Sequence, residues 1–409
     1  MKVVILTHFY PPEMGAAAAR LHGLARCLVQ FGHEVTVLTG FPNYPSGIVA
    51  PEYRSKLRVH EQMDGVEIWR SWIYASPRRS SIQRLANYFS AVGSATISGL
   101  MLGRSYDIVI ASSPPLFIGL AGLALARRRR VPLLLDIRDI WPELAVEAGE
   151  FNSDSAIVRW GERLERFLYR RSTSISVVTE AKRRKLAKKG VPEDKLTLVP
   201  NGVDLELLNS PTDTKLRENL KLEGKFIVVY AGLIGIFQGL HTAVDAANHL
   251  RGHRHIHFLF VGDGVKRADI ERQILSHQLE NITWLPTQPR EAIPGILRAC
   301  DLALVPLVND QLLDAVPSKL LEAWGCHLPV VLVAGGEARR LVEEAGGGVI
   351  VPPGEAQQLA EAILKISKKR DSLDAMSKHG HHYVATQFDR PMLARQMEQV
   401  LKAIVGRAQ

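Results

Sequence analysis

The sequence predicts an α/β protein of two Rossmann-like domains, each built on a doubly wound parallel sheet. Three observations support this prediction. At 409 residues the chain is longer than one hydrophobic core usually covers, because domains typically contain roughly 100–200 residues. The chain opens with an apolar run, a loop, a helical pattern and a second apolar run. The same order recurs from Phe226, and two such βαβ units imply two parallel sheets.

The first unit opens with the apolar run Lys2–Leu6, which ends at a turn containing Pro11 and Pro12. A helical spacing of apolar residues from about 16 to 31 follows, and then a strand at Glu34–Leu38. Four later apolar runs between turn residues predict further strands at Asp107–Ala111, Pro132–Leu135, Ile175–Val178 and Leu196–Val199.

The second unit opens with the strand Phe226–Tyr230, the glycine-rich loop Gly232–Gly239 and a helix to about residue 250. Its later strands are expected at Ile256–Val261, Leu302–Val305, Pro329–Val333 and Gly348–Val351. Between the units, Pro200 and the pair Asn201-Gly202 end a strand and favour a hinge. We therefore expect domains at residues 1–200 and 201–385, and a C-terminal helix at 386–409 that packs back across the domain seam.

Bulk composition predicts an ordinary globular protein, with 46% hydrophobic and 23% charged residues. The cysteines Cys27, Cys300 and Cys326 are odd in number and far apart, which argues against a disulfide framework or a zinc cluster and favours a reducing compartment. No signal-peptide pattern is expected at the N-terminus. The longest uncharged stretch, Leu85–Gly103, contains polar residues and would cross a bilayer poorly. We therefore expect a cytoplasmic protein.

The net charge of +9 is concentrated in the first half, because residues 1–200 carry +10 and the remainder −1. Candidate partners for such a surface are anionic lipid, a pyrophosphate-linked substrate or nucleic acid. A solvated basic face with no partner is the alternative. No aromatic-rich basic platform or recognition motif supports nucleic-acid binding, so we expect none.

Ligands of doubly wound sheets bind at the carboxyl ends of the strands, so both domains should present that edge to one central cleft. In the loop Gly232–Gly239, glycines such as Gly232 and Gly235 let the backbone approach a phosphate at a helix start. A tight turn without a ligand is the alternative. The loop has neither the dinucleotide-binding spacing nor a Walker lysine, which disfavours redox and NTPase functions.

The segment Asp314–Glu322 is more specific. Pro317 and Ser318 suit a helix start, so Ser318 and Lys319 would place a hydroxyl, a cation and free amides at one anion-binding terminus. Glu322, one turn later, could accept hydrogen bonds from both hydroxyls of a ribose. In the alternative interpretation Glu322 is only a surface charge.

Over nearly the whole chain these segments resemble the retaining GT-B glycosyltransferases of family GT4. The resemblance rests on HFYPPEMGAAAARLHGLARCLVQFGHEVTVLTG, DIRDIWPE, VPNGVD, the glycine loop and VPSKLLEAWGCHLPVV. It is strongest to a bacterial branch that includes the L-fucosamine transferases of O-antigen synthesis. The resemblance implies transfer with retention at the anomeric carbon, from a nucleotide sugar, between two closing domains and without a metal or other cofactor.

Carried over by position, Glu322 would bind the ribose, Ser318 and Lys319 the diphosphate, and the amide of Gly15 a phosphate. Residues 285–287 would lie near the base. We expect UDP with an N-acetylated deoxyhexosamine, with GDP-fucose as the rival donor. The whole candidate donor set is Gly15, Gly232, Gly235, Gln238, Gly262, Thr287, Asp314, Ser318, Lys319 and Glu322.

The sequence departs from the wider family where many relatives have an arginine and a lysine in the glycine loop, because Leu233 and Gln238 stand there. A departing diphosphate needs its growing charge stabilised. Lys319 and a cation of the other domain must then carry more of that work, with Arg138 as first candidate and Arg20 as second. Asp314 replaces the usual glutamate, which shortens its reach to the sugar.

The segment Asp136–Glu143 follows a predicted strand and should overhang the cleft. Asp139 could position or deprotonate an acceptor hydroxyl, as an ionised carboxylate beside a cation can. Glu13 is the second candidate, and Arg138 completes the catalytic set. In the alternative interpretation Asp136, Arg138 and Asp139 form only a structural ion pair.

An uncharged helix between cations can dock on an anionic leaflet without crossing it. We expect the N-terminal domain to dock there, at the inner face of the cytoplasmic membrane, and to take a polyprenyl-diphosphate-linked saccharide. In the alternative, Leu85–Gly103 is a buried crossover helix. The basic residues in question are Arg78, Arg79, Arg84, Arg104, Arg127–Arg130 and Lys182–Lys189.

Two other functions fit the same architecture. A nucleotide-sugar 2-epimerase shares the donor site but needs no acceptor, and isomerisation of the donor alone would identify it. A non-catalytic scaffold of an envelope-synthesis complex would explain the two missing cations, and would not bind a nucleotide diphosphate.

Overall fold

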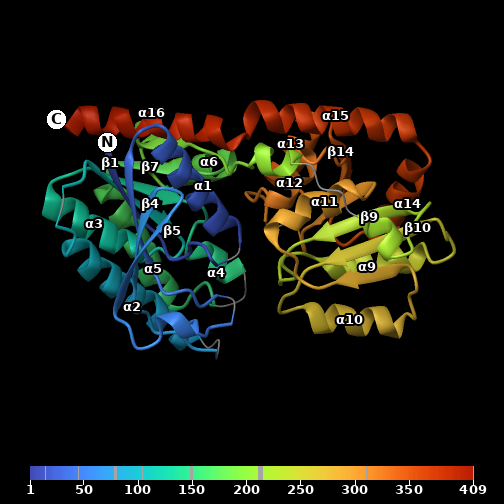
Figure 1. Cartoon of the computed structure of the whole chain (residues 1–409), viewed down its shortest axis with the longest axis horizontal. Coiled ribbons are helices and arrows are strands. Elements are labelled where there is room, and N and C mark those ends of the chain that lie inside the picture. Colours follow the sequence, from blue (N-terminus) through green and yellow to red (C-terminus); the bar gives the residue numbers. More distant parts are fainter. Residues whose placement is uncertain are drawn as a thin grey trace. The chain divides into compact units, whose positions relative to one another are not determined.

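The computed structural model describes residues 1–13, 15–44, 46–77, 81–103, 105–147, 151–210, 215–309 and 312–408. The chain forms two compact units, one of residues 1–201 with 390–409 and one of residues 202–389. Each unit is a parallel sheet between helices (Figure 1). The predicted fold class of two Rossmann-like α/β domains is therefore confirmed.

The first unit contains an eight-stranded sheet in the order β3-β4-β2-β1-β5-β6-β7-β8. All neighbouring strands are parallel except β3 and β4, which form an antiparallel hairpin at one edge. The strands are β1 (Lys2–Leu6), β2 (Glu34–Gly40), β3 (Arg58–Met63), β4 (Val66–Ser71), β5 (Ile108–Ser113), β6 (Leu133–Ile137), β7 (Ser174–Val177) and β8 (Leu196–Leu198).

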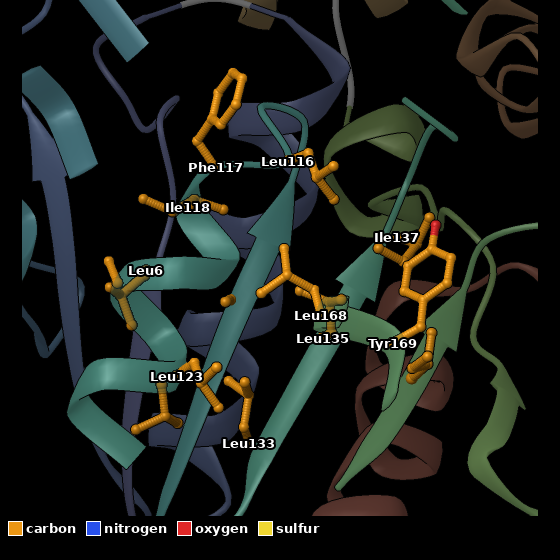
Figure 2. Close-up of a cluster of buried hydrophobic side chains, with 14 of the residues drawn as sticks. Leu6, Leu116, Phe117, Ile118, Leu123, Leu133, Leu135, Ile137, Leu168 and Tyr169 are labelled. Carbon is orange, nitrogen blue, oxygen red and sulfur yellow. The ribbon is translucent and has the colours of Figure 1, made fainter. Parts of the chain in front are cut away.

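Helices cover both faces of this sheet. One core lies between the sheet and α2, α3 and α5; Figure 2 shows Leu135 and Ile137 of β6 close to Leu168 and Tyr169 of α5 there. The other core lies against α1 and α16. The helices are α1 (Ala16–Gln30), α2 (Ser81–Leu100), α3 (Ile118–Arg129), α4 (Glu143–Glu147), α5 (Ala156–Arg171), α6 (Glu180–Lys188) and α16 (Arg390–Ala408), with short 3-10 turns at Pro51–Tyr53 and Glu193–Lys195.

The C-terminal helix α16 completes the first unit. Its residues Met397 and Leu401 are fully buried in the core shared with α1. Glu398 accepts a hydrogen bond from the His33 ring at 2.8 Å. The amphipathic pattern near the end of the chain therefore reflects packing on the first sheet. The chain leaves the first unit after Asn201 and returns to it at Arg390.

The second unit contains a six-stranded, fully parallel sheet in the order β11-β10-β9-β12-β13-β14. Its strands are β9 (Phe226–Ala231), β10 (Ile256–Val261), β11 (Ile282–Leu285), β12 (Leu302–Pro306), β13 (Val330–Val333) and β14 (Gly348–Val351). Its helices are α7 (Leu205–Asn209), α8 (Leu216–Asn219), α9 (Leu240–His249), α10 (Arg267–Ser276), α11 (Ile293–Arg298), α12 (Ser318–Gly325), α13 (Gly336–Ala345), α14 (Ala356–Ser367) and α15 (Arg370–Gln387), with a 3-10 turn at Arg290–Ala292.

Each sheet has one point where the strand order reverses, between β1 and β5 in the first unit and between β9 and β12 in the second. Ligands of open α/β sheets bind beyond the carboxyl ends of the strands at such a point. The loops after β1, β5 and β6 therefore share one edge of the first sheet. The loops after β9, β10 and β12 share the corresponding edge of the second. Among the helices in the described ranges, none combines the length and apolarity needed to span a bilayer.

A buried histidine makes the stability of the second unit depend on pH. His257 of β10 contacts the hydroxyl of Thr283 at 2.8 Å, and burial, assisted by the charge of Lys225, lowers the pKa of His257 to about 4. The unfolded chain binds the same proton with a pKa near 6.5. The contribution of neutral His257 to the free energy of unfolding is therefore fully present above pH 6.5 and is lost as the pH falls towards 4.

We predict that this residue contributes about 2 kcal/mol to the fall in stability between pH 7.5 and pH 5. The measurement is the melting temperature of the full chain at both pH values. His257→Gln should reduce the difference between the two temperatures, whereas His255→Gln, which alters an exposed imidazole, should not. An unchanged difference in His257→Gln would contradict the assignment.

Candidate functional site

In the second unit, the glycine loop and helix α12 lie on either side of the point where the strand order reverses. Gly232 follows β9 with a φ of 137°, which favours glycine. A Cβ atom there would lie 2.5 Å from Cε of Lys319, the second residue of α12. The side chain of Lys319 therefore packs directly on the backbone of Gly232. Any larger residue at 232 would displace it.

The loop after β10 packs on the glycine loop, and this contact explains two further glycines. A Cβ atom on Gly262 would lie 2.1 Å from the carbonyl oxygen of Gly232, and one on Gly264 would lie 2.3 Å from that of Ile234. The indole of Trp284 donates a hydrogen bond to the Gly262 carbonyl at 3.1 Å. These glycines thus let two loop backbones touch.

Side chains within the glycine loop brace it but supply no cation. The Gln238 side-chain oxygen accepts a hydrogen bond from the Gly235 amide at 3.0 Å. The Val308 amide donates to the Phe237 carbonyl at 2.9 Å, which ties the loop to the segment after β12. Leu233 is 47% exposed. Gln238 therefore shapes the loop, and Lys319 supplies the positive charge beside it.

The ammonium of Lys319 lies over the ring of Tyr230, 5.2 Å from its centroid. Within the described ranges it forms no hydrogen bond or ion pair. Burial lowers the pKa of Lys319, and the charge of Glu322 partly offsets this shift. Because a desolvated cation without a direct ion pair is unfavourable, this position favours an anion.

Helix α12 adds its own anion-binding groups at the same place. It begins at Ser318 after Pro317, and no side chain in the described ranges caps it. The first amides of a helix have no partner in the helix and carry its positive dipole end. Ser318 and Glu322 are both half-buried. In the part of the chain that the structure describes, the Glu322 carboxylate makes no hydrogen bond or ion pair.

Asp314 and Thr287 lie on the loops after β12 and β11 of this unit. Asp314 is half-buried, and the adjacent Leu313 carbonyl accepts a hydrogen bond from the Glu337 amide of α13 at 2.8 Å. Thr287 is exposed, two residues after β11, and the Gly262 amide donates to Leu285 at the end of that strand. The structure thus brings Gly232 into direct contact with Gly262 and Lys319. The other predicted donor residues belong to the same unit, except Gly15, which belongs to the first unit.

In the first unit, Asp136 at the end of β6 is fully buried. Its oxygens accept hydrogen bonds from Arg20 at 3.0 Å, Ser112 at 2.9 Å and Ser176 at 2.8 Å. Burial opposes its ionisation, but the charges of Arg20 and Arg138 hold the pKa of Asp136 below its ordinary value. Arg20 also donates to the carbonyls of residues 199 and 200. Arg20 therefore has a structural role beside β8.

Arg138 is buried next to this cluster. Its Nε donates to Ser112 Oγ at 3.1 Å and its Nη2 to the Pro114 carbonyl at 3.0 Å, while Nη1 has no hydrogen bond within the described residues. Burial lowers the pKa of Arg138, but a guanidinium starts so high that it stays charged. Burial and this charge lower the pKa of His8 to about 4. His8 is thus a buried neutral imidazole that the sequence analysis missed, although its place two residues after a predicted strand could have indicated it.

Asp139 stands at the rim of the same sheet edge. Its side chain is 40% exposed, and its Oδ1 lies 3.6 Å from Nζ of Lys182, whose side chain is only 4% exposed. Trp141 fixes the loop by packing on Gly161, where a Cβ would lie 2.5 Å from Cζ3 of the indole. Asp136 pairs with Arg20 and Asp139 with Lys182. Arg138 acts on both carboxylates through its charge but forms no direct ion pair with either among the described residues. The interpretation that these residues have only a structural role stays open.

Glu13 and Gly15 lie in the loop before α1. Glu13 is buried, and its Oε1 accepts hydrogen bonds from the amides of Asn43 and Tyr44, both at 3.0 Å. Burial raises the pKa of Glu13, although these amides and Arg70 act in the opposite direction. Gly15 has a φ of 135° and open space around its Cα. Glu13 thus fixes the loop that contains Asn43 and Tyr44. It also lies near the carboxyl edge of the first sheet.

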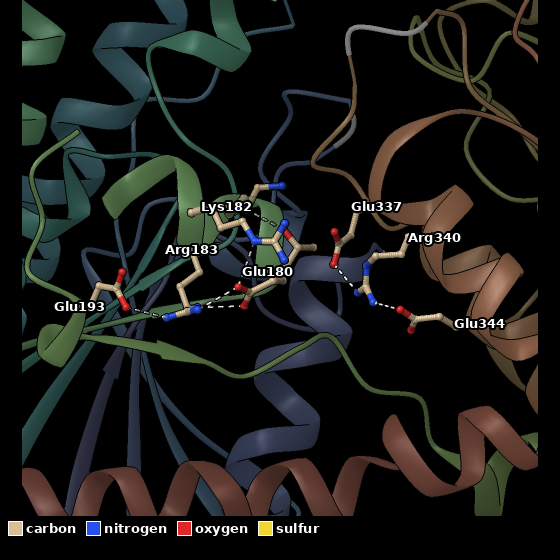
Figure 3. Close-up of polar contacts among 9 residues, drawn as sticks. Glu180, Lys182, Arg183, Glu193, Glu337, Arg340 and Glu344 are labelled. Atoms are coloured by element: carbon tan, nitrogen blue, oxygen red, sulfur yellow. Dashed lines mark hydrogen bonds and ion pairs between the residues drawn. The ribbon is translucent and has the colours of Figure 1, made fainter. Parts of the chain in front are cut away.

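In the basic segment Lys182–Lys189, several cations pair with acidic side chains, whereas Arg184 and Lys188 are exposed. Lys185 pairs with Glu143, and Lys189 pairs with Glu143 at 2.6 Å and Glu165 at 2.9 Å. Acidic side chains thus pair with most cations of this segment, and its part in a lipid-facing basic cluster stays a prediction. Figure 3 shows that Arg183 likewise joins Glu180 and Glu193; in the second unit, Arg340 joins Glu337 and Glu344. Arg78, Arg79 and Arg104 lie outside the described residues.

Comparison with known proteins shows which protein family the chain resembles. Residues 15–202 match the glycosyl transferase 4-like domain, and residues 212–383 match glycosyl transferases group 1. The Escherichia coli (strain K12) protein named as colanic acid biosynthesis glycosyl transferase WcaI is 27% identical over 377 residues, which cover 89% of this chain and 91% of that protein. The 2-deoxystreptamine glucosyltransferase of Streptomyces kanamyceticus is 26% identical over 378 residues, covering 89% and 93%.

The solved structures share the fold. HepE of Anabaena, crystallised in complex with UDP-glucose, superimposes with a TM-score of 0.73 at 19% identity, over 98% of this chain and 100% of that one. The two matched domain families follow each other along almost the whole chain, as the two sheets do. The chain therefore belongs to the GT4-type glycosyltransferases of the GT-B fold.

Proposed function

We propose that this glycosyltransferase moves a sugar, with retention of anomeric configuration, from UDP to a polyprenyl-diphosphate-linked saccharide in bacterial envelope polysaccharide synthesis. The observation that carries the proposal is the ammonium of Lys319 at the start of α12, which packs on Gly232 and has no hydrogen bond or ion pair among the described residues. Similarity to a relative named for colanic acid biosynthesis supports the polysaccharide pathway. The resemblance to fucosamine transferases supports an N-acetylated deoxyhexosamine as the sugar.

In this proposal the second unit binds the donor. The amides of Ser318 and Lys319 and the Lys319 ammonium hold the diphosphate, Glu322 accepts hydrogen bonds from the ribose hydroxyls, and residues 285–287 lie at the base. UDP as the nucleotide is supported by the UDP and UDP-glucose complexes of a protein with this fold. Because Leu233 and Gln238 bring no cation, Lys319 and the helix terminus stabilise most of the charge on the departing UDP.

The first unit supplies the groups that act on the acceptor. The bond between the anomeric carbon and UDP breaks, the acceptor oxygen bonds to that carbon on the same face, and the hydroxyl proton passes to the Asp139 carboxylate. Asp139 suits this role because it is ionisable, partly exposed and held at a sheet edge. Arg138 adds a fixed positive charge there. Glu13, buried and bonded to two amides, is the second candidate base.

We also propose that the first unit docks on an anionic membrane. The unit carries 32 lysines and arginines against 19 acidic residues, and the second unit 19 against 23. On α2 and just after it, Phe89, Ile97, Leu100 and Met101 are exposed by 45–64%, and Trp160 of α5 by 43%. α3 packs against both α2 and α5. Exposed arginines accompany this apolar surface at Arg127, Arg128, Arg130, Arg159, Arg163, Arg166 and Arg170.

Replacing Lys319 tests the donor site. Lys319→Met should lower the affinity for UDP roughly 10- to 100-fold, because charge-assisted hydrogen bonds contribute about 1.5–3 kcal/mol. Isothermal titration calorimetry with UDP measures the effect. Lys378→Met, which alters an exposed lysine of α15, is the matched control and should bind normally. An unchanged affinity in Lys319→Met would exclude this lysine as the diphosphate ligand.

Replacing Asp139 separates chemistry from donor binding. Asp139→Asn should slow transfer by about 100-fold or more, the usual scale for a general base, and leave UDP affinity nearly unchanged. The assay uses UDP-sugars with an undecaprenyl-diphosphate-linked saccharide. Asp154→Asn, on an exposed loop of the same unit, is the control. Full activity in Asp139→Asn would remove this residue from the mechanism, and isomerisation of the donor without acceptor would identify an epimerase.

Vesicle flotation tests the membrane surface. The protein should float with vesicles containing phosphatidylglycerol and much less with phosphatidylcholine alone, because anionic lipid attracts basic side chains near an apolar face. The double variant Phe89→Ser, Trp160→Ser should float less. Leu275→Ser, at a residue of α10 that is 75% exposed, should float like the parent protein. Binding that ignores lipid charge would defeat the docking proposal.

A further inference from the structure

Helix α6 and Lys189, the residue that follows it, present three lysines to acidic groups of the first unit. Lys182, Lys185 and Lys189 follow one another at spacings of three and four residues, so they lie on one face of the helix. Lys185 and Lys189 pair with Glu143 and Glu165. Lys182 pairs with Asp139, and it is the most buried of the three, with side chains 4%, 37% and 25% exposed in chain order.

The ion pair of Lys182 and Asp139 joins a buried cation to a half-exposed anion. A buried ammonium is costly unless an anion compensates it, so Lys182 holds Asp139 from the inner side. The lysine is itself fixed in the first turn of α6, where Thr179 Oγ1 accepts a hydrogen bond from the Lys182 amide at 3.2 Å. Asp139 thus has one side bound to protein and one side open.

The rest of the loop gives Asp139 little freedom. Ile140 and Trp141 are buried in the core, and Arg138 is bonded to Ser112 and Pro114. The backbone on both sides of Asp139 is therefore anchored, and the remaining freedom is the rotation of its carboxylate. Lys182 is the cation that constrains this rotation.

We propose that Lys182 is a positioning residue, which orients the Asp139 carboxylate for the acceptor hydroxyl. This inference rests on the proposed function of Asp139. Lys182 acts through Asp139 and does not touch the substrate. A purely structural role would instead lower the stability of the unit without a specific dependence on Asp139.

A double-mutant cycle distinguishes the two roles, because residues that act through each other show non-additive effects. With UDP-sugar and an undecaprenyl-diphosphate-linked saccharide, Lys182→Met should lower kcat roughly 10- to 100-fold at an almost unchanged donor KM. Lys182→Arg should recover part of the loss, since it keeps the charge. In the Asp139→Asn background, Lys182→Met should cost little more. An equal loss in both backgrounds would overturn the proposal.

Lys188→Met is the matched control, because Lys188 is exposed on the same helix and has no ion pair within the described ranges. Its kcat should equal that of the parent chain. Melting temperatures of all variants check folding, and if Lys182→Met is unfolded, Lys182→Gln replaces it in the cycle.

A second measurement needs no transfer activity, so it remains decisive if the proposed reaction fails. Carboxyl groups are labelled with a carbodiimide and glycine ethyl ester, and the label on Asp139 is quantified by mass spectrometry. Asp139 should be labelled faster in Lys182→Met than in the parent chain or Lys188→Met, because its ion pair is gone. Equal labelling in a folded Lys182→Met variant would show that Lys182 does not hold Asp139.

Discussion

The contact between the Lys319 side chain and the backbone of Gly232 is the interaction on which the donor site depends. It places an ammonium that is partly desolvated, and has no counter-ion among the described residues, beside the free amides of α12. Only a residue without a side chain fits at 232. Gly262 and Gly264 in turn let the neighbouring loop touch the glycine loop. The glycines of this unit are thus needed for packing that brings charge and amides together.

In the first unit, charged groups at the sheet edge are paired with groups of opposite charge. Asp136 is fully bonded to Arg20 and two serines, and three lysines of α6 meet acidic partners. These pairs fix the loop after β6. Asp139 is left as a carboxylate with one bonded and one exposed side, which is the arrangement that a positioned base requires.

The sequence alone predicted the elements whose apolar runs are bounded by turn residues, and the bounds of β1, β10 and β14 agree to the residue. It missed the hairpin of β3 and β4, where polar residues alternate with apolar ones, although Asp64-Gly65 is a typical hairpin turn. It also did not predict the ion pairs of the segment Lys182–Lys189. The acidic partners of Lys182, Lys185 and Lys189 lie up to 46 residues away in the sequence, so only the fold shows these pairs. The roles of the candidate site residues stay predictions.

The most direct measurement is a crystal structure of the protein with UDP. We predict that the diphosphate lies within hydrogen-bond distance of the Lys319 ammonium and the first amides of α12, with the ribose hydroxyls on the Glu322 carboxylate. UDP bound with its diphosphate away from the start of α12, and Lys319 still resting on Gly232 without an anion, would contradict this prediction.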